Sequence, residues 1–353
     1  MDELHVIRLQ PSGHEVVCEP GETVLSALER AGYALANNCR AGACGECKTK
    51  VLSGEYDQGM VLDMALASDE RAAGYGLMCM AKPTSEILDI EYGTGDALPK
   101  LFPPRTGVRF VVTDRIRRTP RIVEIRLRPI GDNLRYWPGQ YLMVGDEASG
   151  VPARPYSIAN APRPDGEISL LVAHVPGGAT SGWIHDAVEA GAHVSVSGPY
   201  GTFVGDPAVE GPVLCLAAGS GLAPILALTD AALRRGFRYP VTVVLSARHP
   251  DDVFDVGPMA WWTARHRQFR FVVCRTGAGE LAPGQRQGRV SAVLPELFDD
   301  LHDHSVFIAG SPEFVADCVT AVRSLGARPE LTYVEGYHAQ APAEMPPTER
   351  LAL

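Results

Sequence analysis

The first part of the chain combines two hydrophobic periodicities. The runs His5–Leu9 and Glu15–Cys18 are strand-like, and the turn formers Pro11-Ser12-Gly13 separate them. In the next segment, Glu22–Ala31, the apolar residues fall on one face of a helix. We therefore expect a small α+β domain over residues 1–95.

A second region, residues 107–206, follows the strand period of two. Apolar and polar residues alternate strictly along Val123–Arg128, as expected for a strand with one buried face. Val194 and Val196 alternate with serines in the same way. The pattern predicts an antiparallel barrel. Residues 96–106, with turn formers and a proline pair, read as the linker before it.

A third pattern covers residues 207–339, where short apolar runs alternate with helical stretches. This alternation predicts an α/β domain with a parallel sheet. The last residues, 340–353, are rich in Pro, Ala and Glu and read as a loose tail. The apolar runs that predict strands are Val213–Leu216, Val241–Leu245, Phe271–Cys274 and Val306–Ile308.

Composition narrows the class of protein. The 353 residues include 42 Asp+Glu and 32 Lys+Arg, a net charge of -10, which argues against nucleic-acid binding and suits a basic protein partner. The most apolar stretch, Val213–Leu228, contains Gly and Pro and is too short to span a membrane. The N-terminus lacks the features of a signal peptide. We expect a cytoplasmic protein, in which clustered cysteines indicate metal or redox chemistry.

Four cysteines have the spacing of an iron–sulfur site. Cys39, Cys44 and Cys47 form C-x4-C-x2-C, and Cys79 follows at a distance. This is the plant-type spacing for one [2Fe-2S] cluster, whose two irons need four thiolates. The alternative is a structural zinc site, which usually combines two C-x2-C units. The other cysteines lie in apolar patterns and are expected to be buried: Cys18, Cys215, Cys274 and Cys318.

Two segments of the barrel region carry candidate flavin ligands. In Arg154-Pro155-Tyr156-Ser157 the guanidinium is suited to a pyrophosphate, and the phenol to a flat ring system. Gly177-Gly178 precedes a predicted helix that includes Thr180 and Ser181, and a glycine-rich turn before a helix N-terminus binds anions. The alternative for the second segment is a plain helix N-cap by Thr180 or Ser181.

A glycine turn in the α/β region is a candidate nucleotide site. Gly219-Ser220-Gly221 follows an apolar strand and opens a helix, but Pro224 stands where a Rossmann fingerprint has its third glycine. Arg248 follows the next strand, where an acidic residue would grip a ribose hydroxyl. An arginine there is compatible with NADPH as well as NADH.

These motifs together resemble known domains. Residues 1–95 resemble a β-grasp ferredoxin domain, and residues 107–206 resemble the six-stranded FAD-binding barrel of the ferredoxin–NADP reductase superfamily. The resemblance implies that Arg154 contacts the flavin phosphates, Tyr156 packs on the isoalloxazine and Ser157 lies near its hydride-accepting nitrogen. It also implies that the segment from Gly177 to Ser181 lines the pyrophosphate.

The nucleotide region resembles the same superfamily. By that resemblance Gly219, Ser220 and Gly221 let the dinucleotide approach the backbone, and the stretch with Arg248 favours NADH, with NADPH possible. Ile308–Pro312 is similar to the Cys-Gly-Pro-Pro turn beside the nicotinamide, with Gly310 retained. Ala309 replaces the cysteine and Ser311 a proline.

Tyr333–Tyr337 is similar to the superfamily's C-terminal Glu-x-aromatic ending beside the flavin. That similarity predicts a catalytic role for Glu335 together with Ser157, and a flavin contact for Tyr337. The alternative is a last strand with a core tyrosine.

The domain order resembles the reductase components of bacterial multicomponent oxygenases, such as methane, phenol and benzoate oxygenase systems. The resemblance implies an NAD(P)H-dependent oxidoreductase that passes electrons from NADH through FAD and a [2Fe-2S] cluster to an oxygenase component. Two alternatives stay open: a reductase for a dehydrase in deoxysugar synthesis, and a redox-responsive binding protein.

Overall fold

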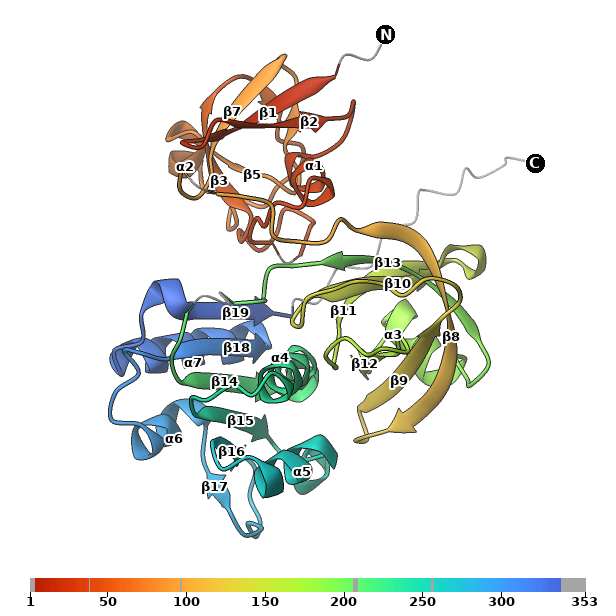
Figure 1. The fold of residues 1–353 in the computed structure, drawn as a ribbon, viewed down its shortest axis with the longest axis vertical. Helices are drawn as coiled ribbons and strands as arrows, with labels where there is room; N and C mark the ends of the chain where they lie inside the picture. Colours follow the sequence, from red (N-terminus) through yellow and green to blue (C-terminus); the bar gives the residue numbers. More distant parts are fainter. Residues whose placement is uncertain (1–3, 38, 96, 206–208, 255–256, 338–353) are drawn as a thin grey trace, which may run out of the picture.

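The computed structural model describes residues 4–37, 39–95, 97–205, 209–254 and 257–337 (Figure 1). Its strands form three main sheets, one in each predicted region. The predicted tail, residues 340–353, lies outside the described residues. Within the described residues, no helix has the length and apolar character needed to cross a membrane.

The N-terminal region is an α+β domain with a five-stranded sheet of order β2-β1-β7-β3-β5. Strands β1 and β7 pair in parallel, whereas β1–β2, β3–β7 and β3–β5 are antiparallel. The predicted helix begins at Val24 rather than Glu22, because the Thr23 side chain accepts a hydrogen bond from the Ser26 amide and caps it. The elements are β1 (His5–Gln10), β2 (His14–Cys18), α1 (Val24–Arg30), β3 (Lys48–Ser53), β4 (Tyr56–Asp57), α2 (Ser68–Ala72), β5 (Tyr75–Leu77), β6 (Lys82–Pro83) and β7 (Ile87–Glu91).

The middle region is the expected antiparallel barrel sheet, of order β11-β10-β13-β8-β9-β12. A bridge between Ile158 and Leu170 joins the end of β11 to β12 and brings the two edges of the sheet together. Apolar side chains from all six strands fill its interior. The elements are β8 (Arg105–Arg117), β9 (Ile122–Pro129), β10 (Tyr141–Asp146), η1 (Glu147–Ser149), β11 (Val151–Ser157), β12 (Ile168–Ala173), α3 (Ala179–Asp186) and β13 (His193–Tyr200).

The strict alternation expected along β9 is wrong at one position. Glu124, predicted on the polar face, is buried with 8% of its surface exposed. Arg118 and Arg126 donate hydrogen bonds of 2.7 and 2.8 Å to its carboxylate. These charged partners compensate the loss of hydration, which the period-two pattern does not represent.

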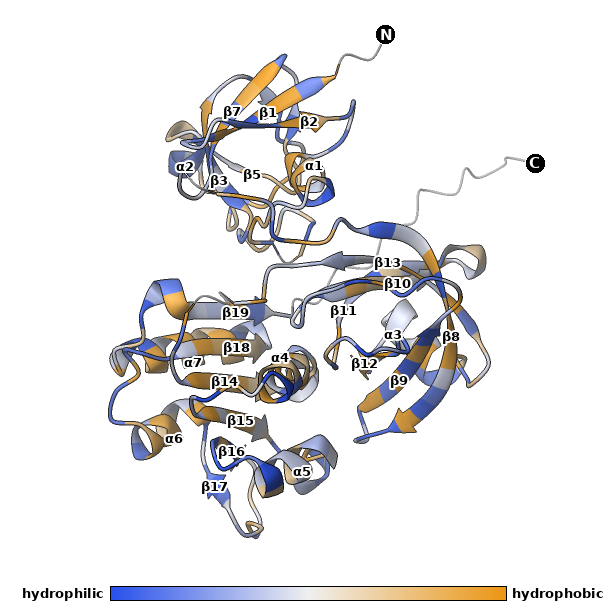
Figure 2. Cartoon of the chain, viewed as in Figure 1, coloured by the Kyte–Doolittle hydropathy of each residue, from blue (hydrophilic) through white to orange (hydrophobic). Residues whose placement is uncertain are grey.

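The C-terminal region is a parallel sheet of order β17-β16-β15-β14-β18-β19 with helices on both faces. Strands β14 and β18 are mostly hydrophobic (Figure 2), as expected for strands covered on both sides. The elements are β14 (Val213–Ala218), η2 (Gly219–Gly221), α4 (Leu222–Arg234), β15 (Val241–Ala247), η3 (Pro250–Asp252), α5 (Gly257–Arg265), β16 (Phe269–Arg275), β17 (Gln285–Gln287), α6 (Val290–Leu297), β18 (Ser305–Gly310), α7 (Pro312–Ser324), η4 (Pro329–Leu331) and β19 (Thr332–Gly336).

Candidate functional site

The four cluster cysteines lie between α1 and β3 and just after β5. Backbone amides point at their sulfur atoms: Cys39 Sγ accepts from Ala41 N and Ala43 N, both at 3.4 Å. Cys47 Sγ accepts from the amide of Cys79, also at 3.4 Å. Such donors stabilise thiolates, the form in which cysteine binds a metal.

The sulfur atoms are arranged as two pairs. A hydrogen bond with Cys44 lowers the pKa of the Cys39 thiol to about 5 and raises that of Cys44. The second pair is Cys47 and Cys79. The hydrogen bond between them raises the pKa of Cys47 and lowers that of Cys79. Among the described residues, no three His, Cys, Asp or Glu side chains are grouped as ligands of one metal ion. Two neighbouring pairs are an arrangement in which each of two irons can take two thiolates.

The turn between the first three cysteines depends on glycine. Gly42 and Gly45 have φ values of +67° and +79°, in the left-handed region. A Cβ on Gly42 would also lie 3.0 Å from the Met60 carbonyl oxygen and from Val61 Cγ1. The loop after β4 therefore packs directly on the cysteine loop.

The remaining four cysteines are core residues, as expected. Each is at most 1% exposed, and burial raises the pKa of each thiol. They are Cys18, Cys215, Cys274 and Cys318.

Three predicted flavin-side residues meet where β11 ends beside β19. Ser157 Oγ donates to Glu335 Oε2 at 2.9 Å and lies 3.0 Å from the Tyr337 hydroxyl, which donates to the same carboxylate oxygen at 3.1 Å. Burial raises the pKa of Glu335 to about 7, although both hydroxyl hydrogen bonds oppose the shift. The group can therefore hold or release a proton near neutral pH.

The other β11 residues line the same strand. Arg154 is half-buried, and its Nη1 donates to the Ala153 carbonyl at 3.0 Å. Tyr156 is half-buried, and desolvation raises the pKa of its phenol. Pro155 holds the strand extended between them. This leaves a guanidinium and an aromatic ring on one short strand, in the spacing that a phosphate and a ring system need.

The glycine turn before α3 differs in detail from the simple capping alternative. Gly178, not Thr180 or Ser181, is the N-cap, and both hydroxyl residues lie inside the helix. Thr180 Oγ1 donates to the Pro152 carbonyl at 2.5 Å, and Ser181 Oγ accepts from the amide of Val175 at 3.1 Å. The two side chains tie the helix start to the first residues of β11 and to the segment just after β12.

Gly177 before this cap has φ +73°, and nothing lies within 4 Å of the place a Cβ would occupy. Open space beside a helix N-terminus fits a diphosphate.

The nucleotide turn lies at the carboxyl end of β14. Gly219 has φ +56° and open space at its Cβ position, whereas a Cβ on Gly221 would collide with the Ala309 carbonyl. Ser220 lies between them in a 3-10 turn that leads into α4. Arg248 is exposed after β15, at the same edge of the sheet. The open side of Gly219 fits a dinucleotide, and Gly221 allows close packing of the turn on β18.

Ala309 and Ser311, which depart from the Cys-Gly-Pro-Pro turn of the superfamily, have defined places in the structure. Ser311 caps α7, because its Oγ accepts from the Phe314 amide at 3.3 Å. Ala309 is fully buried between Ala217 and Glu335 in the sheet register. The Gly310 carbonyl accepts from the Tyr337 amide at 2.8 Å, which fixes the C-terminal segment beside this turn.

An interdomain contact that sequence reasoning missed follows the first cluster cysteine. Arg40 has φ +53°, and its Nη1 lies 2.6 Å from the buried Glu29 carboxylate. The same guanidinium lies 4.5 Å over the ring of Tyr200 at the end of β13. Tyr141 of β10 donates to the Asn37 side chain at 3.2 Å. These contacts hold the cysteine loop against the barrel.

All three regions meet at a cavity of 170 Å³. The cysteine loop contributes Glu46, the segment after β13 contributes Thr202 and Phe203, and β19 contributes Tyr333 and Glu335. Figure 1 shows the N-terminal domain above the junction of the other two. The cysteine loop, through Glu46, and β19, through Glu335, therefore line one common space.

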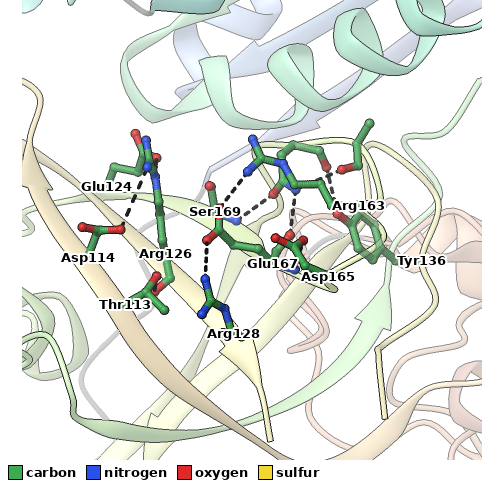
Figure 3. Close-up of polar contacts among 12 residues, drawn as sticks. Thr113, Asp114, Glu124, Arg126, Arg128, Tyr136, Arg163, Asp165, Glu167 and Ser169 are labelled. Atoms are coloured by element: carbon green, nitrogen blue, oxygen red, sulfur yellow. Dashed lines mark hydrogen bonds and ion pairs between the residues drawn. The ribbon is translucent and has the colours of Figure 1, made fainter. Parts of the chain in front are cut away.

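A larger cavity, of 410 Å³, lies elsewhere between the barrel and helices α4 and α5. Its barrel side carries ion pairs rather than free charges (Figure 3): Arg126 pairs with Glu124, and Arg163 donates to Glu167 at 2.7 Å. Burial opposes ionisation of Glu124, but its arginines outweigh burial and lower its pKa. We interpret this network as structural.

Comparison with known proteins agrees with this geometry. Three family models match the chain in order: "2Fe-2S iron-sulfur cluster binding domain" at residues 7–84, "Oxidoreductase FAD-binding domain" at 108–204 and "Oxidoreductase NAD-binding domain" at 215–320. The resemblances proposed from the motifs are confirmed at the level of the domains and their cofactors, a [2Fe-2S] cluster, FAD and NADH.

Curated relatives match over nearly the whole chain. The aromatic O-demethylase reductase subunit of Amycolatopsis is 34% identical, with 92% of this chain and 96% of the relative covered. Terephthalate 1,2-dioxygenase reductase component 1 of Comamonas is 30% identical, with 97% and 98% covered.

The crystal structure of an Amycolatopsis cytochrome P450 reductase, GcoB, is similar, with a TM-score of 0.83 and 32% identity over 94% of this chain and 98% of the other. The protein is an NAD(P)H-dependent oxidoreductase and belongs to the family of oxygenase reductase components that join [2Fe-2S], FAD-binding and NAD-binding domains in one chain.

Proposed function

We propose that this chain transfers electrons from NADH to an oxygenase component, with domains at residues 1–95, 107–206 and 207–339. The convergence of Glu46, from the cysteine loop, and Glu335, from the flavin side, on one cavity carries the proposal. When bound, FAD accepts hydride from the nicotinamide and releases electrons singly to the cluster. The chain must therefore hold these groups close together, and the junction provides the place.

In this proposal the residues described above bind and orient the FAD and the nicotinamide dinucleotide. Arg154 and the α3 N-terminus hold the flavin phosphates, and Tyr156 supports the ring. Gly219 and Gly221 admit the dinucleotide, and the turn at Gly310 positions its nicotinamide end. Two such phosphate sites follow from guanidinium and helix N-terminus chemistry.

In this proposal Ser157 and Glu335 are the catalytic residues. The Ser157 hydroxyl donates to a carboxylate whose pKa is raised to about 7. The pair can move a proton at the serine oxygen without exposing it to water, because Glu335 is 8% exposed. The Tyr337 hydroxyl donates to the same carboxylate oxygen and lies beside the Ser157 hydroxyl, so it helps to hold the pair in place.

The proposed electron donor is NADH and the proposed partner is an oxygenase. Arg248 is exposed at the nucleotide edge, where its guanidinium can also pair with the 2′-phosphate of NADPH. The relatives named above serve an aromatic O-demethylase and a terephthalate dioxygenase, so the partner proposed here is a mono- or dioxygenase acting on aromatic or hydrocarbon compounds. The proposed location is the cytoplasm, where NADH is available.

An anaerobic titration of the purified protein with NADH and, separately, NADPH tests the proposal. We expect flavin bleaching by NADH together with loss of the cluster's visible bands, followed by reduction of added cytochrome c. Flavin bleaching with a cluster that stays oxidised would contradict the proposed path. Loss of flavin binding in Arg154→Ala, but not in the exposed control Arg115→Ala, would support the assignment of the phosphate site.

A further inference from the structure

The loop after β4 exposes three large apolar side chains. Met60, Leu62 and Met64 are 90%, 53% and 87% exposed in the whole chain, so neither of the other domains covers them. Exposed apolar residues that cluster on one loop indicate a contact surface. Methionine is common on such surfaces because its flexible thioether adapts to the partner. We call these three residues the methionine patch.

The methionine patch lies directly on the cysteine loop. The Leu62 amide donates to the Gly42 carbonyl at 3.1 Å. A Cβ placed on Gly42 would be 3.0 Å from the Met60 carbonyl oxygen. Contacts toward the flavin side come from other residues of the cysteine region, Arg40 and Asn37. The patch is therefore next to the cluster ligands and remains accessible when the domains are together.

Charge around the patch selects the kind of partner. Residues 1–95 contain 15 Asp and Glu against 7 Lys and Arg, a difference of -8 within the chain's net -10. Beside the patch, the side chain of Asp63 is 96% exposed and pairs with Arg71 at 3.2 Å, and Asp57 is exposed nearby. A basic protein would be steered to this domain.

We propose that the methionine patch is the docking contact for the electron-accepting protein, which presents an apolar hollow ringed by Lys and Arg above its own redox centre. This inference rests on the proposed function and names the surface through which electrons leave. The acidic domain disfavours a second copy of this chain as occupant, because two such domains repel each other. It equally disfavours an anionic membrane.

The test uses the full-length holoprotein with cytochrome c as the basic one-electron acceptor. The variant Met60→Gln/Met64→Gln keeps side-chain length and removes the apolar ends. The matched control is Val17→Gln/Leu52→Gln, which changes two side chains, each 49% exposed, in strands of the same domain. Stopped-flow absorbance measures flavin and cluster reduction by NADH, and steady-state assays measure cytochrome c reduction.

We expect unchanged internal reduction in both variants. In the methionine variant, kcat/KM for cytochrome c should fall about tenfold through a higher KM, a loss of ~1.4 kcal/mol. The control should match wild type. Hydrogen exchange of the mixture should show protection of residues 58–66, a readout independent of turnover.

Two results would overturn the inference. One is equal kcat/KM in the methionine variant and in wild type, and the other is protection confined to another surface. A change in self-association, measured by sedimentation, would assign the patch to a second copy and also refute it. If wild type reduces its cluster but no cytochrome c at all, the proposed function fails rather than the docking contact. The failure of one proposal is therefore distinguishable from the failure of the other.

Discussion

Glu335→Gln is the most informative single change, because it removes a proton site and keeps the shape. Glu335 is buried and accepts hydrogen bonds from Ser157 and Tyr337 at 2.9 and 3.1 Å. A glutamine carbonyl can accept the same two bonds. Any difference between the proteins then reports on ionisation rather than on packing.

The size of the effect follows from the pKa of Glu335, which burial raises from 4.5 to about 7. One pKa unit corresponds to about 1.4 kcal/mol, so ionising this group costs about 3 kcal/mol in the folded protein. Because the folded pKa is above the unfolded one, this contribution to stability is fully present below pH 4.5. It is lost as the pH rises through about 7.

We therefore expect wild type and Glu335→Gln to have similar stability near pH 5. At pH 8 the variant should be more stable by about 3 kcal/mol, measured as the free energy of unfolding by urea with tryptophan fluorescence. Glu330→Gln, a change at an exposed carboxylate near the same strand, should follow wild type at every pH. If the free energy of unfolding changed with pH in the same way in wild type and in Glu335→Gln, the raised pKa of Glu335 would be refuted.

The same variant tests the catalytic proposal. Flavin bleaching by NADH should show a pH step near 7 in wild type, and Glu335→Gln should remove the step and slow bleaching about 100-fold. An unchanged rate in the variant would end the catalytic role of Glu335. A slower rate that keeps the pH step would assign the proton to another group.

Three further predictions concern the loops around the junction. Cys47→Ser should abolish the visible bands and the electron paramagnetic resonance signal of the cluster, while flavin content, measured by absorbance, stays near that of wild type. Gly221→Ala should raise the KM for NADH at least tenfold in steady-state assays, because the new Cβ would collide with a backbone carbonyl; an unchanged KM would contradict this packing. Arg40→Ala should leave Glu29 buried without its charged partner, with only the Asn37 amide still donating to it, at a cost of about 3 kcal/mol, and speed hydrogen exchange of α1 about 100-fold. Arg30→Ala breaks a more exposed pair, between the last residue of α1 and Glu22 before the helix. It should speed exchange less than about fivefold, and equal effects would refute the burial argument.

Local patterns were sufficient for most of the architecture. The strands predicted at Val213–Leu216 and Val241–Leu245 are the cores of β14 and β15, because a buried parallel strand needs a continuous apolar run. The cysteine spacing was readable because one short loop must supply three thiolates. In both cases the sequence neighbours are also the spatial neighbours.

Contacts between distant segments required the structure. Glu124 was expected on a polar face, and its burial depends on Arg118, which lies across a turn and also contacts the carboxylate. The capping alternative at Thr180 failed because its hydroxyl reaches the Pro152 carbonyl, 28 residues earlier. In each case, a distant hydrogen-bond partner determines where a polar side chain lies, and no local periodicity reveals that partner.

The junction itself is the strongest example of this limit. The Arg40 guanidinium lies over Tyr200, and nothing in either local sequence points to the other. Their contact exists because α1 supplies a buried carboxylate, Glu29, that directs the arginine toward the barrel. A motif can thus indicate that a cluster and a flavin belong to one chain, whereas the relative placement of their sites depends on side chains outside every motif.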